Sequence, residues 1–329
     1  MPRLIVSHIF MLCAALILCP VGWSADAPGA TRIAKWKDDK QAAFMLMFDD
    51  SCQTHVKLVI PELVKRKLTG TFYLNPGSGQ YQGVKNDWEV LIPKLGMEYA
   101  NHTFTHKGAK DAADLDDELV KCDEAIARIA GGKRPPLISF GQPGVPQGKW
   151  TVTDQELKDA LAKHHLIMRP PVGGRFAEIN LKTAADLFGI AEKALAAGSS
   201  DCVVFHGVGG DWLAASLQTF TDLLDKLVAA QDKLWIGGHI AVYSYQIERE
   251  GAKVAVEPAG SKSIRLKLTT SADPALFTAP LTLVTRVPNG WTRCKVSQGS
   301  ATATVAVIDG MVRYDALPDG QPVVIQPTP

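Results

Sequence analysis

The chain has few cysteines, no cluster of like charges and, beyond its first 25 residues, no apolar run long enough to span a membrane. Its 329 residues carry 35 Lys and Arg against 34 Asp and Glu, which gives a formal net charge of +1. Without a basic stretch, the sequence predicts no nucleic-acid partner. Hydrophobic residues make up 46% of the chain, enough at this length for the core of one large domain or two.

Cysteine usage gives no sign of a disulfide framework or of a cysteine-rich metal site. Of the 6 cysteines, Cys13 and Cys19 lie in the N-terminal apolar run. The others are far apart, with no CxxC pair, and they allow several pairings between which spacing cannot choose. A domain of this size needs no covalent staples, so we expect free, buried thiols.

The N-terminus has the features of a secretory signal peptide. Arg3 precedes an apolar run from Leu4 to Val21, and small residues follow it. A membrane anchor is one alternative, but Pro20 ends the run early. A lipoprotein site at Cys19 is another, although a leucine precedes that cysteine. We therefore predict a signal peptide over residues 1–25, export to the periplasm or the cell exterior, and no stable membrane insertion after cleavage.

Residues 33–250 alternate short apolar runs with stretches of helical periodicity. Near-continuous apolar runs of this length fit parallel strands that are buried on both faces. The runs are Ala42–Phe48, Gly70–Leu74, Met97–Ala100, Leu137–Phe140, Leu166–Met168, Cys202–Phe205 and Leu234–Ile236. Between them, apolar residues at helical spacing cover Leu115–Ile129 and Leu213–Val228. This alternation of strands and helices predicts a barrel-like α/β fold.

A second domain is predicted over residues 251–329. Here apolar and polar residues alternate, valine and threonine are frequent, and no helical period is present. Asp309–Gly310 separates two such runs and is typical of a hairpin turn. We predict a small antiparallel, sandwich-like β domain that packs on the barrel.

Polar residues follow the predicted strands, at the points where the strands end. Because the carboxyl ends of parallel strands form one rim, these side chains are expected to gather in one place. They are Asp49, Asp50, Asn75, Asn101, His102, Gln142, Arg169 and His206. The rim is therefore where the sequence predicts an active site.

Asp49 and Asp50 end the first predicted strand. On an extended strand neighbouring side chains point in opposite directions, so one carboxylate can ligate a metal while the other acts as a base. Two adjacent acids at the end of a buried strand are costly without a cation. A solvated turn with capping carboxylates is the simpler alternative, and the pair alone does not decide between the two.

Three histidines complete the candidate set. His102 and His106, in NHTFTH, can converge on one cation if the segment winds as a turn. Two histidines with one aspartate leave positions open for water and substrate. His206, directly after CVVF, can donate a proton to a leaving group. Taken singly, each is as readily explained as a surface or rim histidine, so the common rim is the argument for a site.

MFDD, NHTFTH and VVFH, in this order and separation, resemble the first, second and fifth motifs of the NodB-type polysaccharide deacetylases, carbohydrate esterase family 4. TGTFYLNPG and LWIGGHIAVYSYQIERE are also similar to that family, so the resemblance covers roughly residues 35–250. It implies a distorted (β/α)7 barrel that removes N- or O-linked acetyl groups from glycans.

The same resemblance implies a role for each candidate by its position. Asp49 would be the base that activates water, and His206 the general acid. Asp50, His102 and His106 would hold one divalent metal. Zinc is the expected ion, and cobalt, nickel or iron suit the same ligands.

Two motifs of that family are not matched. The third contains an arginine that orients the catalytic aspartate, but SFGQPG has Gly141 or Gln142 at that point. Arg169 follows the next strand and is predicted to take its place, with a solvent-facing loop arginine as the alternative. The fourth motif, DxxDW, is not recognisable, and Asp211–Trp212 is a candidate for its role.

Three hypotheses of function follow. The leading one is metal-dependent deacetylation of an acetylated polysaccharide or oligosaccharide, which is then the expected partner. The second is hydrolysis of a non-glycan amide, although relatives of that kind often lose one metal histidine, and both are present here. The third is a sugar-binding module with little or no turnover. The missing arginine favours this module, whereas the retained base, ligands and acid argue against it.

Overall fold

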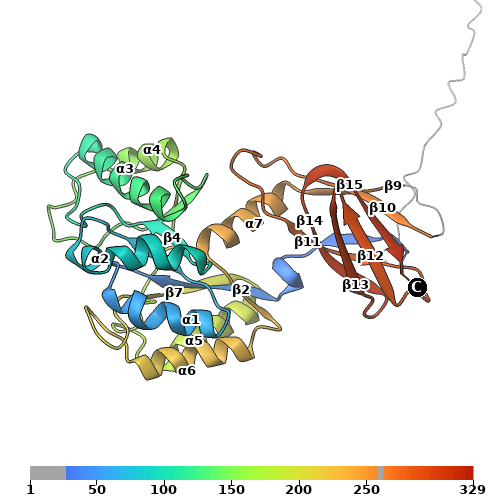
Figure 1. Ribbon diagram of the computed structural model, residues 1–329, viewed down its shortest axis with the longest axis horizontal. Coiled ribbons are helices and arrows are strands. Elements are labelled where there is room, and N and C mark those ends of the chain that lie inside the picture. The colour runs from blue at the N-terminus through green and yellow to red at the C-terminus, as the bar shows by residue number, and fades with distance from the viewer. Residues whose placement is uncertain (1–26, 258–261, 329) are drawn as a thin grey trace, which may run out of the picture.

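The structure is a computed structural model that describes residues 27–257 and 262–328, and the predicted signal peptide lies outside these residues. Two lobes lie side by side (Figure 1): a barrel of parallel strands wrapped by helices, and an antiparallel β sandwich. The predicted fold class, a distorted barrel followed by a small β domain, is confirmed. No helix among the described residues is long and apolar enough to cross a membrane.

The barrel sheet has seven parallel strands in the order β6-β5-β4-β3-β2-β7, with β8 paired to the first half of β2. Each apolar run predicted as a strand is one, with small shifts at its ends. The strands are β2 (Ala42–Phe48), β3 (Thr71–Leu74), β4 (Glu98–Asn101), β5 (Ile138–Phe140), β6 (Leu166–Met168), β7 (Ser200–Phe205) and β8 (Leu234–Ile236).

Strand β2 is apolar throughout because both of its faces are buried. Phe44, Leu46 and Phe48 belong to the core between the sheet and the surrounding helices. Met45 and Met47 belong to a second cluster in the barrel interior. Side chains alternate along a strand, so the residue after Phe48 continues the interior series.

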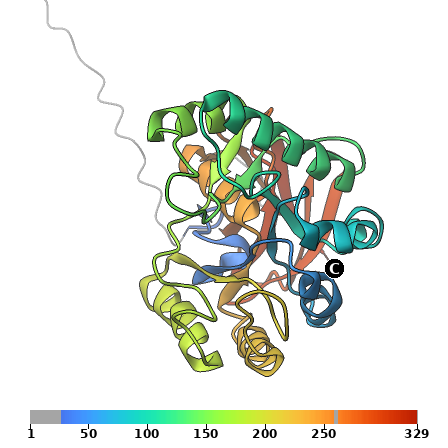
Figure 2. The ribbon, with the colours of Figure 1, turned by 90° about the vertical axis from the view of Figure 1, so that its left-hand side faces the viewer.

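Helices surround the curved sheet, as the end-on view shows (Figure 2). They are α1 (Ile60–Lys65), α2 (Gly79–Gly83), α3 (Ala112–Ile129), α4 (Asp154–Lys163), α5 (Ala184–Ala197), α6 (Leu217–Ala229) and α7 (His239–Gly251), with short turns η1 (Lys37–Asp39), η2 (His55–Val59), η3 (Asp87–Leu91) and η4 (Ile92–Lys94). The two helices predicted from periodicity are α3 and α6. However, α6 begins at Leu217 and not at Leu213, because Leu213 has a left-handed backbone (φ 42°) and Ser216 caps the helix.

The sandwich packs a three-stranded sheet, β1-β11-β14, against a five-stranded one, β13-β12-β15-β10-β9. Its strands are β1 (Thr31–Ile33), β9 (Lys253–Glu257), β10 (Ile264–Thr269), β11 (Leu281–Arg286), β12 (Arg293–Gln298), β13 (Ala301–Ala306), β14 (Met311–Ala316) and β15 (Asp319–Pro327). Strand β1 precedes the barrel in the chain, so residues from both sides of the barrel build this lobe. The sequence pattern did not indicate this.

The predicted turn at Asp309–Gly310 and the predicted free cysteines can both be checked in the structure. Asp309 and Gly310 form the predicted turn, with φ values of 52° and 73°. The strands on either side enter different sheets, however, and only Ile308 and Met311 pair across the turn. The cysteines Cys52, Cys122, Cys202 and Cys294 are free and buried, as predicted.

Helix α7 joins the two lobes. Half-buried Glu98, at the start of β4, accepts hydrogen bonds from the amides of Ile240 and Ala241 at the first turn of α7. Farther along the helix, Tyr245 belongs to the sandwich core, and its hydroxyl donates to the carbonyl of Ala34. The sandwich therefore lies at the amino end of the barrel strands, and the carboxyl rim faces away from it (Figure 1).

Candidate active site

The rim brings Asp49 and Arg169 into direct contact, as the sequence predicts. Asp49 is 2% exposed and continues the interior series of β2. One carboxylate oxygen, Oδ1, accepts a hydrogen bond of 2.6 Å from Arg169, and the other lies 3.9 Å from His102 Nε2. Burial alone would raise the pKa of Asp49, but the Arg169 guanidinium and nearby histidines outweigh it and hold that pKa below its ordinary value. The catalytic role of the pair stays a prediction.

Gly141 provides the space that Arg169 occupies. The Arg169 guanidinium lies 4.7 Å from the centre of the Tyr73 ring, a cation–π contact inside the barrel. A Cβ atom on Gly141 would lie 3.1 Å from Arg169 Cζ and 2.8 Å from Tyr73 Cδ1. The glycine found where the resembling family has an arginine is therefore what lets an arginine from the next strand reach Asp49.

The two aspartates converge on the same point, and they do not diverge as the strand argument predicted. The reason is that β2 ends at Phe48 and that Asp50 takes a left-handed backbone, with φ 72°. Asp50 Oδ1 lies 3.5 Å from His102 Nε2, on the same side as Asp49. Alternation of side chains holds only within an extended strand.

His102 and His106 lie on the tight turn that the sequence predicts. Thr103 and His106 have φ values of 64° and 58°, and the two imidazole centres are 5.0 Å apart. Because a carbonyl only accepts, His102 Nδ1 must carry the proton that it donates to the Gly141 carbonyl, over 2.7 Å. A neutral His102 thus presents the lone pair of Nε2 to the site.

The geometry around Asp50 fits a divalent cation. Single donor atoms of Asp50, His102 and His106 all lie within 4.8 Å of one another. Asp50 Oδ1 is buried without a hydrogen-bond partner among the described residues, and His106 Nε2 lies 3.1 Å from it. Lone pairs that face one another this closely repel unless His106 Nε2 carries a proton or a cation lies among the donor atoms. Two imidazole nitrogens and one carboxylate oxygen suit zinc, cobalt, nickel or iron.

His206 reaches the same point from β7 and is held by two residues that the sequence reasoning missed. Its Nδ1 bonds Glu178, and its Nε2 lies 3.9 Å from Asp50 Oδ2. Burial lowers the pKa of His206, but Glu178 and the aspartates outweigh it, so the pKa is raised. Buried His55, whose pKa burial lowers to about 4, is neutral and donates to the His206 carbonyl.

Glu178 was detectable from the sequence as the only acid between Arg169 and Lys182, on the loop after β6. This loop returns to the rim because Phe176 pairs with Val204 of β7. Asp211, which the sequence reasoning offered for the unmatched fourth motif, has another contact: its carboxylate accepts from the Thr54 amide. Its neighbour Trp212 is 60% exposed.

Comparison with known proteins finds a family that is similar to part of this site. The family model for polysaccharide deacetylases matches residues 37–153, which contain MFDD and NHTFTH. Residues 37–153 are therefore similar to the polysaccharide deacetylase family. A curated relative, gellan lyase from a Bacillus species, is 24% identical over 91% of this chain. The chain spans only 13% of the length of that protein.

Two solved structures are similar to this chain at low sequence identity. A putative polysaccharide deacetylase from Mycobacterium smegmatis is 14% identical, with a TM-score of 0.49, over 63% of this chain and 90% of its own. A family 4 carbohydrate esterase from Streptomyces lividans, in complex with acetate, is 21% identical, with a TM-score of 0.44, over 60% of this chain and 93% of its own.

Proposed function

We propose that the protein hydrolyses N- or O-linked acetyl groups of a polysaccharide or oligosaccharide with the help of one divalent metal ion. The observation that carries the proposal is the separation of roles at the rim. Asp49 is bound to Arg169, whereas Asp50 forms a distinct donor set with His102 and His106. His206 adjoins both from another strand.

Asp49 is the base. It accepts a proton from the water that attacks the acetyl carbonyl, and it has to be ionised to do so. Arg169 keeps it ionised, because the guanidinium holds the pKa of Asp49 below its ordinary value against the effect of burial. Arg169 also fixes the orientation of the carboxylate, since its hydrogen bond occupies Oδ1 and leaves Oδ2 toward the site.

His206 is the general acid. Glu178 accepts from the Nδ1 side of the ring, so the proton on Nε2 faces the site and can pass to the departing amine or hydroxyl oxygen. The contacts with Glu178 and the aspartates raise the pKa of His206, which favours the protonated ring. The products are acetate and a free amino or hydroxyl group on the sugar.

Asp50, His102 and His106 would hold the metal, which when bound would polarise the acetyl carbonyl and lower the pKa of water. Next to Glu178 and Asp211 in the chain, the loops after β6 and β7 expose Ile179 and Trp212. Exposed apolar side chains beside a polar centre fit the apolar face of a sugar ring.

A released-acetate screen tests this function. The panel contains chitin oligomers, peptidoglycan fragments, acetylated xylan, small acetylated sugars and a non-glycan acetamide. We expect acetate from at least one saccharide, only after the chelator-treated protein is reloaded with zinc or cobalt. Release from the non-glycan amide alone would favour the second hypothesis, and saccharide binding without acetate release would favour the binding module.

The location of the protein is also proposed. The signal-peptide pattern of residues 1–25 supports export to the periplasm or the cell exterior. Cell fractionation, with the N-terminus of the mature protein sequenced, tests this. A cytoplasmic protein that keeps Met1 would contradict it.

A further inference from the structure

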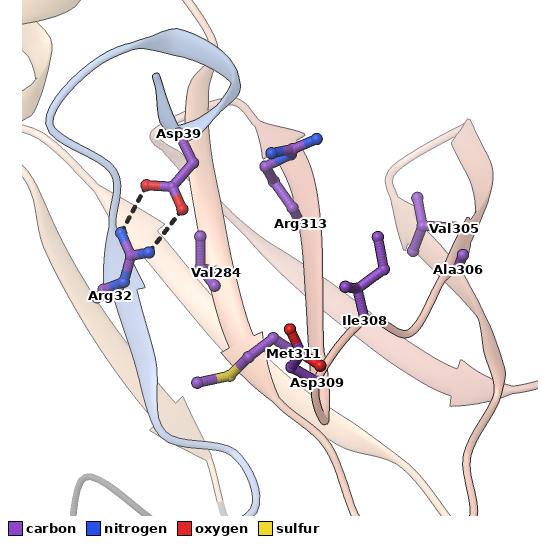
Figure 3. A pocket seen from close by; sticks show the side chains of 9 residues that line it. All are labelled: Arg32, Asp39, Val284, Val305, Ala306, Ile308, Asp309, Met311 and Arg313. Carbon is purple, nitrogen blue, oxygen red and sulfur yellow. Dashed lines mark hydrogen bonds and ion pairs between the residues drawn. The ribbon is translucent and has the colours of Figure 1, made fainter. Parts of the chain in front are cut away.

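The sandwich carries a groove of about 430 Å³ that lies outside the candidate active site. Its floor is the outer face of the sheet β1-β11-β14, and its far wall is the connection from β13 to β14, which includes Ile308 and Asp309 (Figure 3). Because the sandwich lies at the amino end of the barrel strands, the groove is remote from the carboxyl rim (Figure 1).

Register places two arginines in one row across this sheet. Arg32 of β1 is opposite Val284 of β11, and Val284 is opposite Arg313 of β14. Residues directly opposite each other in paired strands share a face. The two guanidinium groups therefore flank an apolar residue that is 6% exposed.

The two arginines differ in their partners. Arg32 makes two parallel hydrogen bonds to Asp39, of 2.8 and 2.6 Å, which occupy both carboxylate oxygens. Exposed Arg313 makes no hydrogen bond or ion pair with any described residue, and Figure 3 draws it without a contact. The neighbouring Lys37 on the same face is paired with Asp315. Arg32 and Lys37 therefore have ion-pair partners within the protein, whereas the guanidinium group of Arg313 is available to a ligand.

The other residues that line the groove indicate which chemical groups a ligand needs. Asp309 at the turn is exposed and has no partner among the described residues, so it can accept from hydroxyl groups. Met311 and Ile308, the latter 67% exposed, add apolar surface to the lining. A ligand therefore needs an anionic group, hydroxyl donors and an apolar face within one short segment, and a sugar acid combines all three.

We propose that this groove binds an acidic saccharide segment, with its carboxylate on Arg313, a hydroxyl on Asp309 and its ring face on Met311 and Ile308. The inference rests on the proposed function, since it takes the polysaccharide substrate as the source of the ligand. The distance from the rim makes this a holding site for another part of the polymer, and a bound segment there raises the effective concentration of acetylated units at the rim.

Calorimetric titration of the full chain at low salt tests the groove directly. The probes are a galacturonate oligomer, a xylose oligomer of equal length and a glutamate oligomer. We expect the galacturonate oligomer to bind, and the neutral oligomer to bind at least about tenfold more weakly, because a charge-assisted contact is lost. Added salt should weaken the binding, since the contact is exposed.

The variants are Arg313→Gln and Asp309→Asn, the second chosen because asparagine tolerates the left-handed backbone at this turn. Each should weaken galacturonate binding, the first about tenfold or more. Lys295→Gln is the matched control, because Lys295 is an exposed cation on β12 that does not line the groove. It should leave the affinity unchanged.

Three results would overturn the inference: no galacturonate binding, equal affinity of Arg313→Gln and Lys295→Gln, or glutamate oligomer binding as tight as that of galacturonate. Acetate release from a small acetylated sugar separates this failure from a failure of the proposed function. If the parent and Arg313→Gln release acetate at the same rate, the proposed deacetylase function stands, whatever the groove binds. Absence of release from all proteins would reject the proposed function, and with it the assumed source of the ligand.

Discussion

The two ends of the barrel differ in the hydrogen-bond partners of their carboxylate groups. At the amino end, Glu98 is half-buried, and the Thr71 hydroxyl and backbone amides of α7 donate hydrogen bonds to its carboxylate. At the carboxyl rim, Asp50 Oδ1 is buried and has no hydrogen-bond partner among the described residues. The carboxylate at the amino end binds the first turn of α7, whereas the one at the rim has an oxygen that is available to a cation.

Left-handed non-glycine residues occur at both ends of the barrel, and Asp39, Lys67 and His165 lie before strands β2, β3 and β6. Left-handed non-glycine residues flank the rim site at Asp50, Ser51, Thr103 and His106. Such conformations cost roughly 1 kcal/mol or more each and persist where surrounding structure enforces them. What distinguishes the rim is that such residues adjoin a buried carboxylate oxygen without a hydrogen-bond partner among the described residues. The variants below ask how far the two ends differ in role.

The largest effect is expected from His102→Ala at the rim. This change removes one of three converging donors, so metal content after dialysis should fall at least tenfold, and acetate release with it. Elemental analysis of the purified protein gives the metal content. Unchanged metal content would show that the Asp50 cluster is not the metal site.

Asp49→Asn should separate the neighbouring carboxylates. The side chains are nearly isosteric, so the metal should be retained, while kcat falls about a hundredfold or more because the base is lost. Metal content and kcat are measured on the same preparation. Loss of metal together with activity would mean that Asp49 is a ligand and that the two aspartates have exchanged roles.

Gly141→Ala tests the space around Arg169. The added Cβ meets Tyr73 and Arg169 inside a filled interior, so the guanidinium has to move away from Asp49. A displacement of this kind should lower kcat about tenfold or more, with metal content unchanged. Gly144→Ala is the control, because nothing lies within 4 Å of its added Cβ. Equal kcat values for the two variants would argue against a role for the Arg169–Asp49 contact.

The sequence predicted the strands of the barrel well because strands buried on both faces must be continuously apolar. It also placed Asp49, Asp50, His102 and His206 correctly at one rim. It could not predict that Asp50 leaves the strand with φ 72°, since a single left-handed residue has no pattern.

Pairing between strands that are far apart in the chain could not be predicted from the sequence either. Strand β1 is three residues long and pairs with β11, some 250 residues later, so no local periodicity marks it. Glu178 was missed for a similar reason, because its partner His206 lies on another loop. In both cases the contact follows from how the barrel and sandwich assemble, and not from any local run of residues.

His239→Gln should change the pH dependence of stability and leave the rim intact. His239 is buried at the start of α7 and bonds Ser139, and burial, with the charge of Arg169, lowers its pKa to about 4. The folded protein therefore binds the proton less well than the unfolded chain. This contribution is complete above the unfolded pKa of about 6.5 and is lost as pH falls toward 4, by at most about 1.4 kcal/mol per pH unit.

Urea unfolding at several pH values between 4 and 7 measures this dependence. The slope of stability against pH should be smaller in His239→Gln than in the parent. His55 contributes in the same direction, so some slope should remain. Exposed His165 supplies the control, because His165→Asn removes a titrating group without a buried partner and should leave the slope unchanged.

The smallest effect on turnover is expected from removal of residues 251–329, because every rim residue lies before them in the chain. A chain ending at Glu250 should deacetylate a small acetylated sugar at nearly the parental rate. It should be less soluble, since Tyr245 and strand β1 lose the core that covers them. If this shortened chain aggregates, Leu283→Ala in the full chain is the alternative. Leu283 is fully buried in the sandwich. The substitution should lower the free energy of unfolding by about 2–5 kcal/mol and leave kcat unchanged. A folded, metal-loaded protein of either kind without activity would place part of the active site in the sandwich, and the two ends of the barrel would then share the chemistry.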